Sequence, residues 1–355
     1  MSNAYQITVV VSTYNRCEML PAALEHLLEQ ETGGICYEVI VVDNNSSDAT
    51  REVVRRIIGE GHPNLRYVFE PKQGSSFARN AGIAATTAEI IAFVDDDVVV
   101  AKDWIATIKQ AFEDQPEIDC IGGKVVPIWS APIPKWLNSD HWMPLALQDY
   151  GNNQLTIDLH NMLCLVSANI AFRREALLAA GMFKPELQRV KDGVGSMEDA
   201  ELLERLWKAE RKSRYIPDLI VRAVVPTERI NKTYHRRWHR GHGYFYAIKR
   251  EKEIDNGSLR FLDVPAHLYK RAVLDLAYWF LLLMRNPSKA FICETRLHFF
   301  YGFFCKRRED YLSTAYRGPL HELACFLRAL FTKEVKPNSS LIQGSALSER
   351  PGARQ

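Results

Sequence analysis

Three adjacent carboxylates, Asp95, Asp96 and Asp97, interrupt an apolar segment in the sequence IIAFVDDDVVV. Like charges this close repel one another and are costly to remove from water, so either solvent or a cation must reach them. Side chains two residues apart at a strand end point the same way, so Asp95 and Asp97 should face one ligand and Asp96 elsewhere. Hard divalent cations such as Mg²⁺ and Mn²⁺ bind carboxylates and phosphate oxygens together. The pattern therefore predicts a metal–diphosphate site, with a solvated acidic turn as the alternative.

A further carboxylate, Asp43, follows another apolar segment in the sequence VVDNNSSDAT. An aspartate in this position can accept a hydrogen bond from a uracil N3–H or from a ribose hydroxyl. The neighbouring Ser46, Ser47 and Asp48 are typical helix-capping residues, which offers a structural explanation of the same cluster. The segment therefore indicates a nucleoside contact, a helix start, or both.

The segment GSSFARNAG, residues 74–82, carries Arg79 and Asn80 on a predicted helix whose small residues allow a ligand to approach closely. Arginine can bind a phosphate through two parallel hydrogen bonds. A salt bridge at the protein surface is the alternative role for a single arginine.

Glu198 and Asp199 begin a predicted helix after the glycine-containing loop KDGVGS. Ser196 followed by Asp199 resembles a capping box, and acids are favoured at helix N-termini, which would make both acids structural. Alternatively, the positive end of the helix keeps Asp199 ionised, ready to take a proton from an acceptor hydroxyl. The residues of this segment leave both roles open.

Residues 226–250 contain seven Lys or Arg side chains against one Glu, together with His235, His239 and His242. Such a basic and aromatic stretch can bind single-stranded nucleic acid, neutralise a diphosphate or contact anionic lipid. The formal net charge of the chain is only +2, so we expect no nucleic-acid partner. We expect the stretch to meet a diphosphate.

Short segments rich in Val and Ile alternate with helical patterns through the first 125 residues, which predicts a layered α/β domain with a mostly parallel sheet. The predicted strands are 6–12, 37–43, 65–70 and 89–95, and the predicted helices are 18–30, 48–59, 75–87 and 103–114. Ligands bind beyond the carboxyl ends of strands in such sheets. STYNR, DNNSSD and VDDDV all follow predicted strands, so they should converge at one edge.

The composition of the chain changes after about residue 125. Residues 1–225 are expected to form the catalytic domain, with an irregular insertion at 127–161 that is rich in Pro, Trp and Asn. Residues 226–332 should form the basic and aromatic segment and C-terminal helices, and the polar residues 333–355 a disordered tail.

Two apolar segments flanked by basic residues, 271–285 and 294–308, fall short of the roughly 20 residues that a spanning helix needs. They suit a helix lying in the bilayer interface or a helical pair packed on the protein. Seven scattered cysteines and the lack of a basic leader predict a cytoplasmic protein with reduced thiols. We expect at most peripheral contact with the inner face of the cell membrane.

The segments VVVSTYNR, VVDNNSSD, QGSSFARNAG, IAFVDDDV, SANIAFRREAL and MEDAELLERL, in this order, resemble the family-two inverting glycosyltransferases with the glycosyltransferase-A fold. The resemblance covers roughly residues 6–245. It implies a UDP-, GDP- or dTDP-sugar donor, a Mg²⁺ or Mn²⁺ ion at the DxD motif, and single displacement with inversion. It also suggests a carbohydrate or lipid-linked acceptor, in the synthesis of a cell-surface polysaccharide or glycolipid.

The resemblance assigns roles to individual residues. Asp199, beside Glu198, corresponds to the catalytic base, and Asp97 with Asp95 corresponds to the metal site. The candidates for binding the nucleotide sugar are Thr13, Tyr14, Asn15, Asp43, Arg79, Asn80, Asp95 and Asp96.

Two positions depart from the family pattern. Many relatives carry a histidine after the strand that follows the ED helix, whereas Ala223 occupies that place here. Arg229 and His235 are therefore the candidates for contacting the diphosphate. Processive members carry QxxRW and several membrane spans, but the matching stretch here begins with Tyr234. We expect addition of one sugar per encounter.

Other classes of protein match the sequence less well. A sugar nucleotidyltransferase needs a Gly-rich loop with Arg or Lys after the first strand, and a dinucleotide dehydrogenase needs GxGxxG there. The segment STYNRCEML contains neither. A non-catalytic adaptor that binds a nucleotide sugar, a membrane or nucleic acid on the same fold would tolerate replacement of Asp97 or Asp199.

Overall fold

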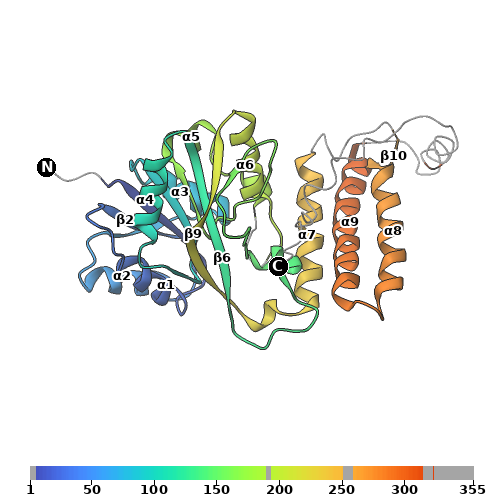
Figure 1. The fold of residues 1–355 in the computed structure, drawn as a ribbon, viewed down its shortest axis with the longest axis horizontal. Helices are drawn as coiled ribbons and strands as arrows, with labels where there is room; N and C mark the ends of the chain where they lie inside the picture. The colour runs from blue at the N-terminus through green and yellow to red at the C-terminus, as the bar shows by residue number, and fades with distance from the viewer. Residues whose placement is uncertain (1–4, 189–192, 251–258, 315–322, 324–355) are drawn as a thin grey trace. The chain divides into compact units, whose positions relative to one another are not determined.

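The structure of the protein is a computed structural model, shown in Figure 1. It describes residues 5–188, 193–250, 259–314 and 323. The chain divides into two compact units: the first is Met1–Ile133 with Trp142–Ile230, and the second is Pro134–His141 with Asn231–Gln355. The predicted tail at 333–355 lies outside the described residues.

The described part of the first unit is built on a nine-stranded, mostly parallel sheet with the order β3-β2-β1-β4-β8-β6-β9-β5, and β7 pairs with β9 beside this path. The strands are β1 (Ile7–Thr13), β2 (Tyr37–Asp43), β3 (Leu65–Phe69), β4 (Ile90–Asp95), β5 (Val98–Val100), β6 (Ile118–Trp129), β7 (Leu155–Ile157), β8 (Ile170–Arg173) and β9 (Lys212–Val225). The Val- and Ile-rich segments of β1, β2 and β4 are buried on both faces, as their composition requires. The predicted fold class is confirmed.

Helices complete the first unit. They are α1 (Leu20–Leu28), α2 (Thr50–Gly59), α3 (Ser75–Ala84), α4 (Trp104–Asp114), α5 (Arg174–Ala179) and α6 (Glu198–Lys208). Short 3-10 turns occur as η2 (Met143–Leu145), η3 (Pro185–Leu187) and η4 (Thr227–Arg229) in this unit and as η1 (Ser139–His141) in the second. In the predicted insertion, residues 127–129 continue β6 and residues 155–157 form β7.

The register of the central strands brings the polar segments to one edge of the sheet. Thr13 at the end of β1 pairs with Asp43 at the end of β2, and Ser12 pairs with Asp95 at the end of β4. All three strands run parallel, so the segments STYNR, DNNSSD and VDDDV leave the sheet on the same side. The predicted convergence is confirmed.

The second unit is helical. It contains α7 (Lys232–Lys249), α8 (Ala266–Leu282) and α9 (Pro287–Thr314), together with the short antiparallel pair β10 (Arg260–Phe261) and β11 (Val264–Pro265). Helix α9 packs against both α7 and α8, as Figure 1 shows. None of the described helices combines the length and hydropathy needed to cross a membrane.

Two glycines allow α7 and α9 to approach until their backbones touch. A Cβ atom on Gly243 would lie 2.0 Å from the carbonyl oxygen of Phe299, and one on Gly302 would lie 1.9 Å from that of Arg240. These obstacles are main-chain atoms, so a larger residue at either position would force the helices apart.

We expect Gly302→Ala to lower the free energy of unfolding of the protein by about 1–3 kcal/mol, the usual cost of overpacking a tight interior. Gly59→Ala is the matched control, because a Cβ atom at the end of α2 meets nothing within 4 Å. Denaturant titration of the two variants makes the comparison. Equal stability of both variants would contradict close contact between α7 and α9.

Candidate active site

The three carboxylates of VDDDV lie on the turn between β4 and β5. Asp95 is the last residue of β4, and Val98 of β5 pairs antiparallel with Ala223 of β9. The amide of Val224 donates to the carbonyl oxygen of Asp97 over 3.0 Å, so β9 fixes the backbone of this turn. Ala223 is 7% exposed, and its methyl side chain offers no ligand atom.

Asp96 turns into the protein, as the alternation of side chains along the chain predicts. It is 8% exposed, and the Thr13 hydroxyl donates to its Oδ2 over 2.7 Å. Burial and the negative charge of Asp97 raise the pKa of Asp96 to about 7, against the opposing effects of Arg16 and Thr13. Asp96 and Thr13 are therefore joined to each other beneath the site.

Asp97 faces two arginines. Its Oδ2 lies 3.5 Å from Nη1 of Arg16 and 4.0 Å from Nη1 of Arg229, and its side chain is 9% exposed. Arg229 was predicted as a diphosphate candidate from the sequence, whereas Arg16 was not. The signal was present, because Arg16 ends the STYNR segment three residues after β1.

The residues of this turn fit a hard divalent cation by their chemistry. Asp95 and Asp97 both retain partial exposure and present carboxylate oxygens, the donor type that Mg²⁺ and Mn²⁺ prefer. No group of three or more His, Cys, Asp or Glu side chains suited to a metal occurs among the described residues. One or two carboxylates from the protein are the normal complement for Mg²⁺ when substrate phosphates supply the other ligands.

The loops after β1 and β2 are tied to each other. Asn15, whose φ is +51°, donates its amide to the Ser46 hydroxyl over 2.9 Å and accepts from the Ser47 amide over 2.8 Å. The neighbouring Tyr14 remains partly exposed in the same loop. The pairing gives this edge of the sheet a defined shape.

Asp43 is 2% exposed and accepts hydrogen bonds on both oxygens, from the Ser46 amide over 2.9 Å and from the Tyr67 hydroxyl over 2.6 Å. The capping explanation is partly correct nearby, since Asp48 accepts from the amide of Thr50 at the start of α2. The N-cap position of α2 itself belongs to Ala49.

A buried ion-pair cluster joins α3 to α6. Nη1 of Arg79 lies 3.1 Å from Oε1 of Glu198 and 3.7 Å from Oδ1 of Asp199. The charge of Asp95 also acts on Arg79, so the cluster extends toward the carboxylate turn. Arg79 is 9% exposed, which rules out the alternative of a surface salt bridge.

One carboxylate oxygen of Asp199 is hydrogen-bonded, whereas the other has, among the described residues, only the ion pair with Arg79 at 3.7 Å. The amide and the hydroxyl of Ser167 both donate to its Oδ2 over 3.0 Å. Its Oδ1 is buried and receives no hydrogen bond from the described residues. Burial raises the pKa of Asp199 to about 6, and the charge of Glu198 adds to the increase, whereas Arg79 and the Ser167 contacts oppose it.

Ser167 was not among the predicted residues, although it opens the segment SANIAF on which the resemblance rests. The predicted capping box at Ser196 is wrong. Helix α6 begins at Glu198 with Met197 at the N-cap, and no side chain caps it. Glu198 and Asp199 therefore both lie in the first turn, where the helix dipole favours their negative charge.

Asn80 and Gln188 hold the N-terminal half of α3 in place. The Asn80 side chain donates to the Phe183 carbonyl and accepts from the Phe183 amide, over 2.8 and 3.1 Å. Gln188 accepts from the Ser76 amide over 2.8 Å, and a Cβ atom on Gly74 would lie 2.2 Å from its Oε1. Both the nitrogen and the oxygen of the Asn80 side chain are therefore bound within the protein. These contacts hold the part of α3 that carries Arg79.

His235 belongs to α7 of the second unit. It is fully buried, and its ring lies 5.1 Å from that of Trp136 and 6.1 Å from that of Phe291. The surroundings are aromatic, which is typical of a packed interior.

The sheet, with its carboxylate turn after β4 and a second acidic pair on α6, has the architecture of the glycosyltransferase-A class. Two solved structures share the fold. They are a mannosyltransferase from Pyrobaculum calidifontis in complex with GDP-Man and Mn²⁺ (TM-score 0.51, 19% identity, 94% of this chain and 82% of that one) and GalNAc-T7 with UDP, GalNAc and Mn²⁺ (TM-score 0.51, 16% identity, 70% and 51%).

Residues 8–179 match the family model described as glycosyl transferase family 2. This match agrees with the resemblance found in the sequence.

Two curated relatives illustrate the range of this family. A glucosyl-dolichyl phosphate glucuronosyltransferase of Haloferax volcanii is 27% identical over 209 residues, which span 57% of this chain and 64% of the relative. A validoxylamine A glucosyltransferase of Streptomyces hygroscopicus is 35% identical over 107 residues, 30% of this chain and 25% of the relative. The matches therefore span less than two thirds of these relatives.

Proposed function

We propose that the protein transfers one sugar from a nucleoside diphosphate sugar to an acceptor hydroxyl, with inversion at the anomeric carbon. The observation that carries this proposal is Asp199, whose Oδ2 is fixed by Ser167 while its buried Oδ1 lacks a hydrogen bond from the described residues. Arg79 lies 3.7 Å from this oxygen, beyond hydrogen-bond distance, so the position of a hydrogen-bond donor is left for a ligand. An acceptor hydroxyl is a donor of the right kind.

The reaction follows from these groups. The acceptor oxygen attacks the anomeric carbon, the bond from that carbon to the diphosphate oxygen breaks, and the hydroxyl proton passes to Asp199. Inversion results because the base and the leaving diphosphate act on opposite faces of the sugar. Arg79 is paired with both Glu198 and Asp199. Its positive charge opposes the increase in the pKa of Asp199 and so favours the ionised base.

The leaving diphosphate needs positive charge. Asp97 and Asp95 would hold Mg²⁺ or Mn²⁺, which when bound supplies charge that stabilises the diphosphate as it leaves. Arg16 and Arg229 lie within 4.0 Å of Asp97 and would take up the phosphate oxygens. They would act in place of the family histidine that Ala223 replaces.

The nucleoside is assigned to the joined loops after β1 and β2, with Asp43, Asn15 and Tyr14, because this edge adjoins the carboxylate turn. UDP, GDP and dTDP remain the candidate carriers. The names of the relatives include a lipid-linked and a small-molecule acceptor. For this chain we propose a carbohydrate or lipid-linked acceptor, in the synthesis of a cell-surface polysaccharide or glycolipid.

The direct test is a panel of nucleotide sugars with Mn²⁺ or Mg²⁺, scored for release of nucleoside diphosphate by the wild type and by Asp97→Ala. One donor should be turned over, and Asp97→Ala should abolish the release. Equal release by the variant, or no release from any donor, would reject the proposal in favour of a binding protein on the same fold.

The pH dependence offers an independent measurement. A general base must be ionised, so kcat/KM should rise as the pH passes through the pKa of Asp199, about 6, and level off above it. The negative charge of Glu198 contributes to the raised pKa, so Glu198→Gln should move the acid limb of the profile to lower pH. A shift to higher pH would contradict the assignment of this limb to Asp199.

A further inference from the structure

Helix α8 of the second unit buries its carboxylate and exposes many of its apolar side chains, the reverse of an ordinary surface helix. Its one carboxylate, Asp275, is 2% exposed and accepts from Nε of Arg296 on α9 over 2.9 Å and from Nε of Arg271 over 3.4 Å. The outward side chains are apolar and between 43% and 92% exposed. They are Val273, Leu274, Leu276, Tyr278, Phe280, Leu281, Leu283 and Met284, and we refer to them as the α8 outer face.

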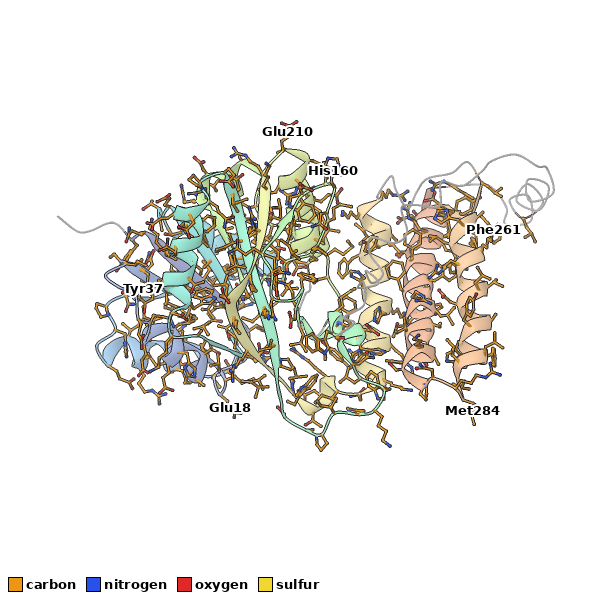
Figure 2. All side chains as sticks on the ribbon, in the orientation of Figure 1. Glu18, Tyr37, His160, Glu210, Phe261 and Met284 are labelled. Atoms are coloured by element: carbon orange, nitrogen blue, oxygen red, sulfur yellow. The ribbon has the colours of Figure 1, made fainter. Side chains whose placement is uncertain are left out.

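This arrangement is unfavourable in water. A surface helix normally turns its apolar stripe to the core and its polar side chains to solvent. Exposed apolar patches of this extent on soluble proteins mark interaction surfaces. Helices in lipid show the reverse pattern found here, in which ionisable side chains face neighbouring helices and pair there. Figure 2 shows Met284, the most exposed of the set at 92%, at the C-terminal tip of α8.

The charges in and next to α8, including Lys289 at the start of α9, indicate which partner this face suits. From Val264 to Cys293 the sequence contains four Lys or Arg residues, Lys270, Arg271, Arg285 and Lys289, and all four are exposed. Asp275 is the only Asp or Glu in this range and is turned inward. A second copy of the chain, docked through the same face, would bring cations together without acids to pair with them. Lipid phosphates supply the negative charge that this surface lacks.

We propose that the α8 outer face docks on an anionic lipid bilayer, with the helix lying in the interface and its terminal cations at the level of the headgroups. Helix α8 has 17 residues, and no described helix can cross a membrane, so the contact is peripheral. Tyr278 has the amphipathic ring that favours the membrane interface, and Phe280 is typical of the apolar face of an interfacial helix. The docking stands apart from the proposed function, although it would bring the enzyme to the surface where a lipid-linked acceptor lies.

Sedimentation of the full-length protein with vesicles tests the proposal. We expect binding to phosphatidylcholine vesicles that contain phosphatidylglycerol, little binding to phosphatidylcholine alone, and weaker binding at high salt. The double variants Phe280→Ser/Met284→Ser and Lys270→Gln/Lys289→Gln should each lower the partition constant by about tenfold or more. All four side chains are exposed, so both proteins should remain folded.

The matched control is Ile133→Ser/Met143→Ser, which removes two apolar side chains that are 50% and 51% exposed outside α8 and should bind like the wild type. Nucleoside diphosphate release, measured without lipid, should be unchanged in all variants, so a failed docking proposal is separable from a failed enzymatic one. Absence of vesicle binding by the wild type would overturn the proposal. A lipid-free dimer that Phe280→Ser/Met284→Ser dissociates would overturn it in favour of a second copy.

Discussion

Asp199→Asn is expected to lower kcat by about 10²- to 10⁴-fold, the usual contribution of a positioned general base, and to leave donor binding nearly unchanged. The amide oxygen can still accept the two Ser167 hydrogen bonds that hold Oδ2, so the side chain should keep its place. The amide cannot take up the proton of the acceptor hydroxyl. Steady-state kinetics with the active donor, together with unfolding curves of the variant, separate lost chemistry from lost structure.

Glu198→Gln is the matched control. Glu198 is 4% exposed, neighbours Asp199 in the first turn of α6, and accepts from the Ser75 hydroxyl over 3.0 Å as well as from Arg79. Its Oε2, like Oδ1 of Asp199, is buried without a hydrogen bond from the described residues, but its Oε1 is bound to Ser75 and Arg79, so its replacement should retain most of kcat at neutral pH. If Glu198→Gln were inactive and Asp199→Asn active, the two acids would have to exchange roles.

The central sheet was predictable from the sequence because each strand is specified by its own short run of residues. Strands buried on both faces demand continuous Val and Ile, and the polar residues that follow β1, β2 and β4 then have to share an edge. The inward direction of the Asp96 side chain followed from the alternation of side chains along a strand. The resemblance to glycosyltransferases was recognisable because six short segments occurred in one fixed order.

The partners of the site residues were not predictable, because they come from distant parts of the chain. Arg79 looked like a surface residue by itself and became buried only through α6, about 120 positions later. Ser167 and Gln188 act through hydrogen bonds from loops, which leave no pattern in the sequence. Met197 took the N-cap position that Ser196 seemed to offer, and local propensity could not decide between neighbouring residues.

His235 was predicted to contact a diphosphate, but its buried position could not be predicted from the sequence. A basic and aromatic stretch suggests an anion site, yet in α7 the periodicity of the helix turns His235 inward. Its neighbours, Trp136 and Phe291, come from a preceding loop and from α9. In α8 the pattern of apolar residues predicted a helix correctly, but only the pairing of Asp275 with Arg296 shows which side faces out.

Asp97→Asn should lower kcat by about 10²- to 10³-fold, comparable to loss of one preorganised electrostatic contact with a transition state. It should also raise the Mn²⁺ concentration needed for half-maximal activity, because a neutral amide is a weaker ligand for a hard cation. Titration of Mn²⁺ by electron paramagnetic resonance, in the presence of the nucleoside diphosphate, measures that affinity without catalysis.

Asp119→Asn distinguishes a loss at the site from the general cost of breaking a salt bridge. Asp119 is 6% exposed and lies 3.1 Å from Arg211, so it resembles Asp97 in burial and in having an arginine partner. It sits at the start of β6, where Ile118 pairs with Lys212, whereas Pro127 at the far end of β6 pairs with Ala223 beside the carboxylate turn. We expect Asp119→Asn to lower stability and to leave the Mn²⁺ affinity unchanged. Equal effects of the two variants on Mn²⁺ would mean that Asp97 serves only to anchor Arg16 and Arg229.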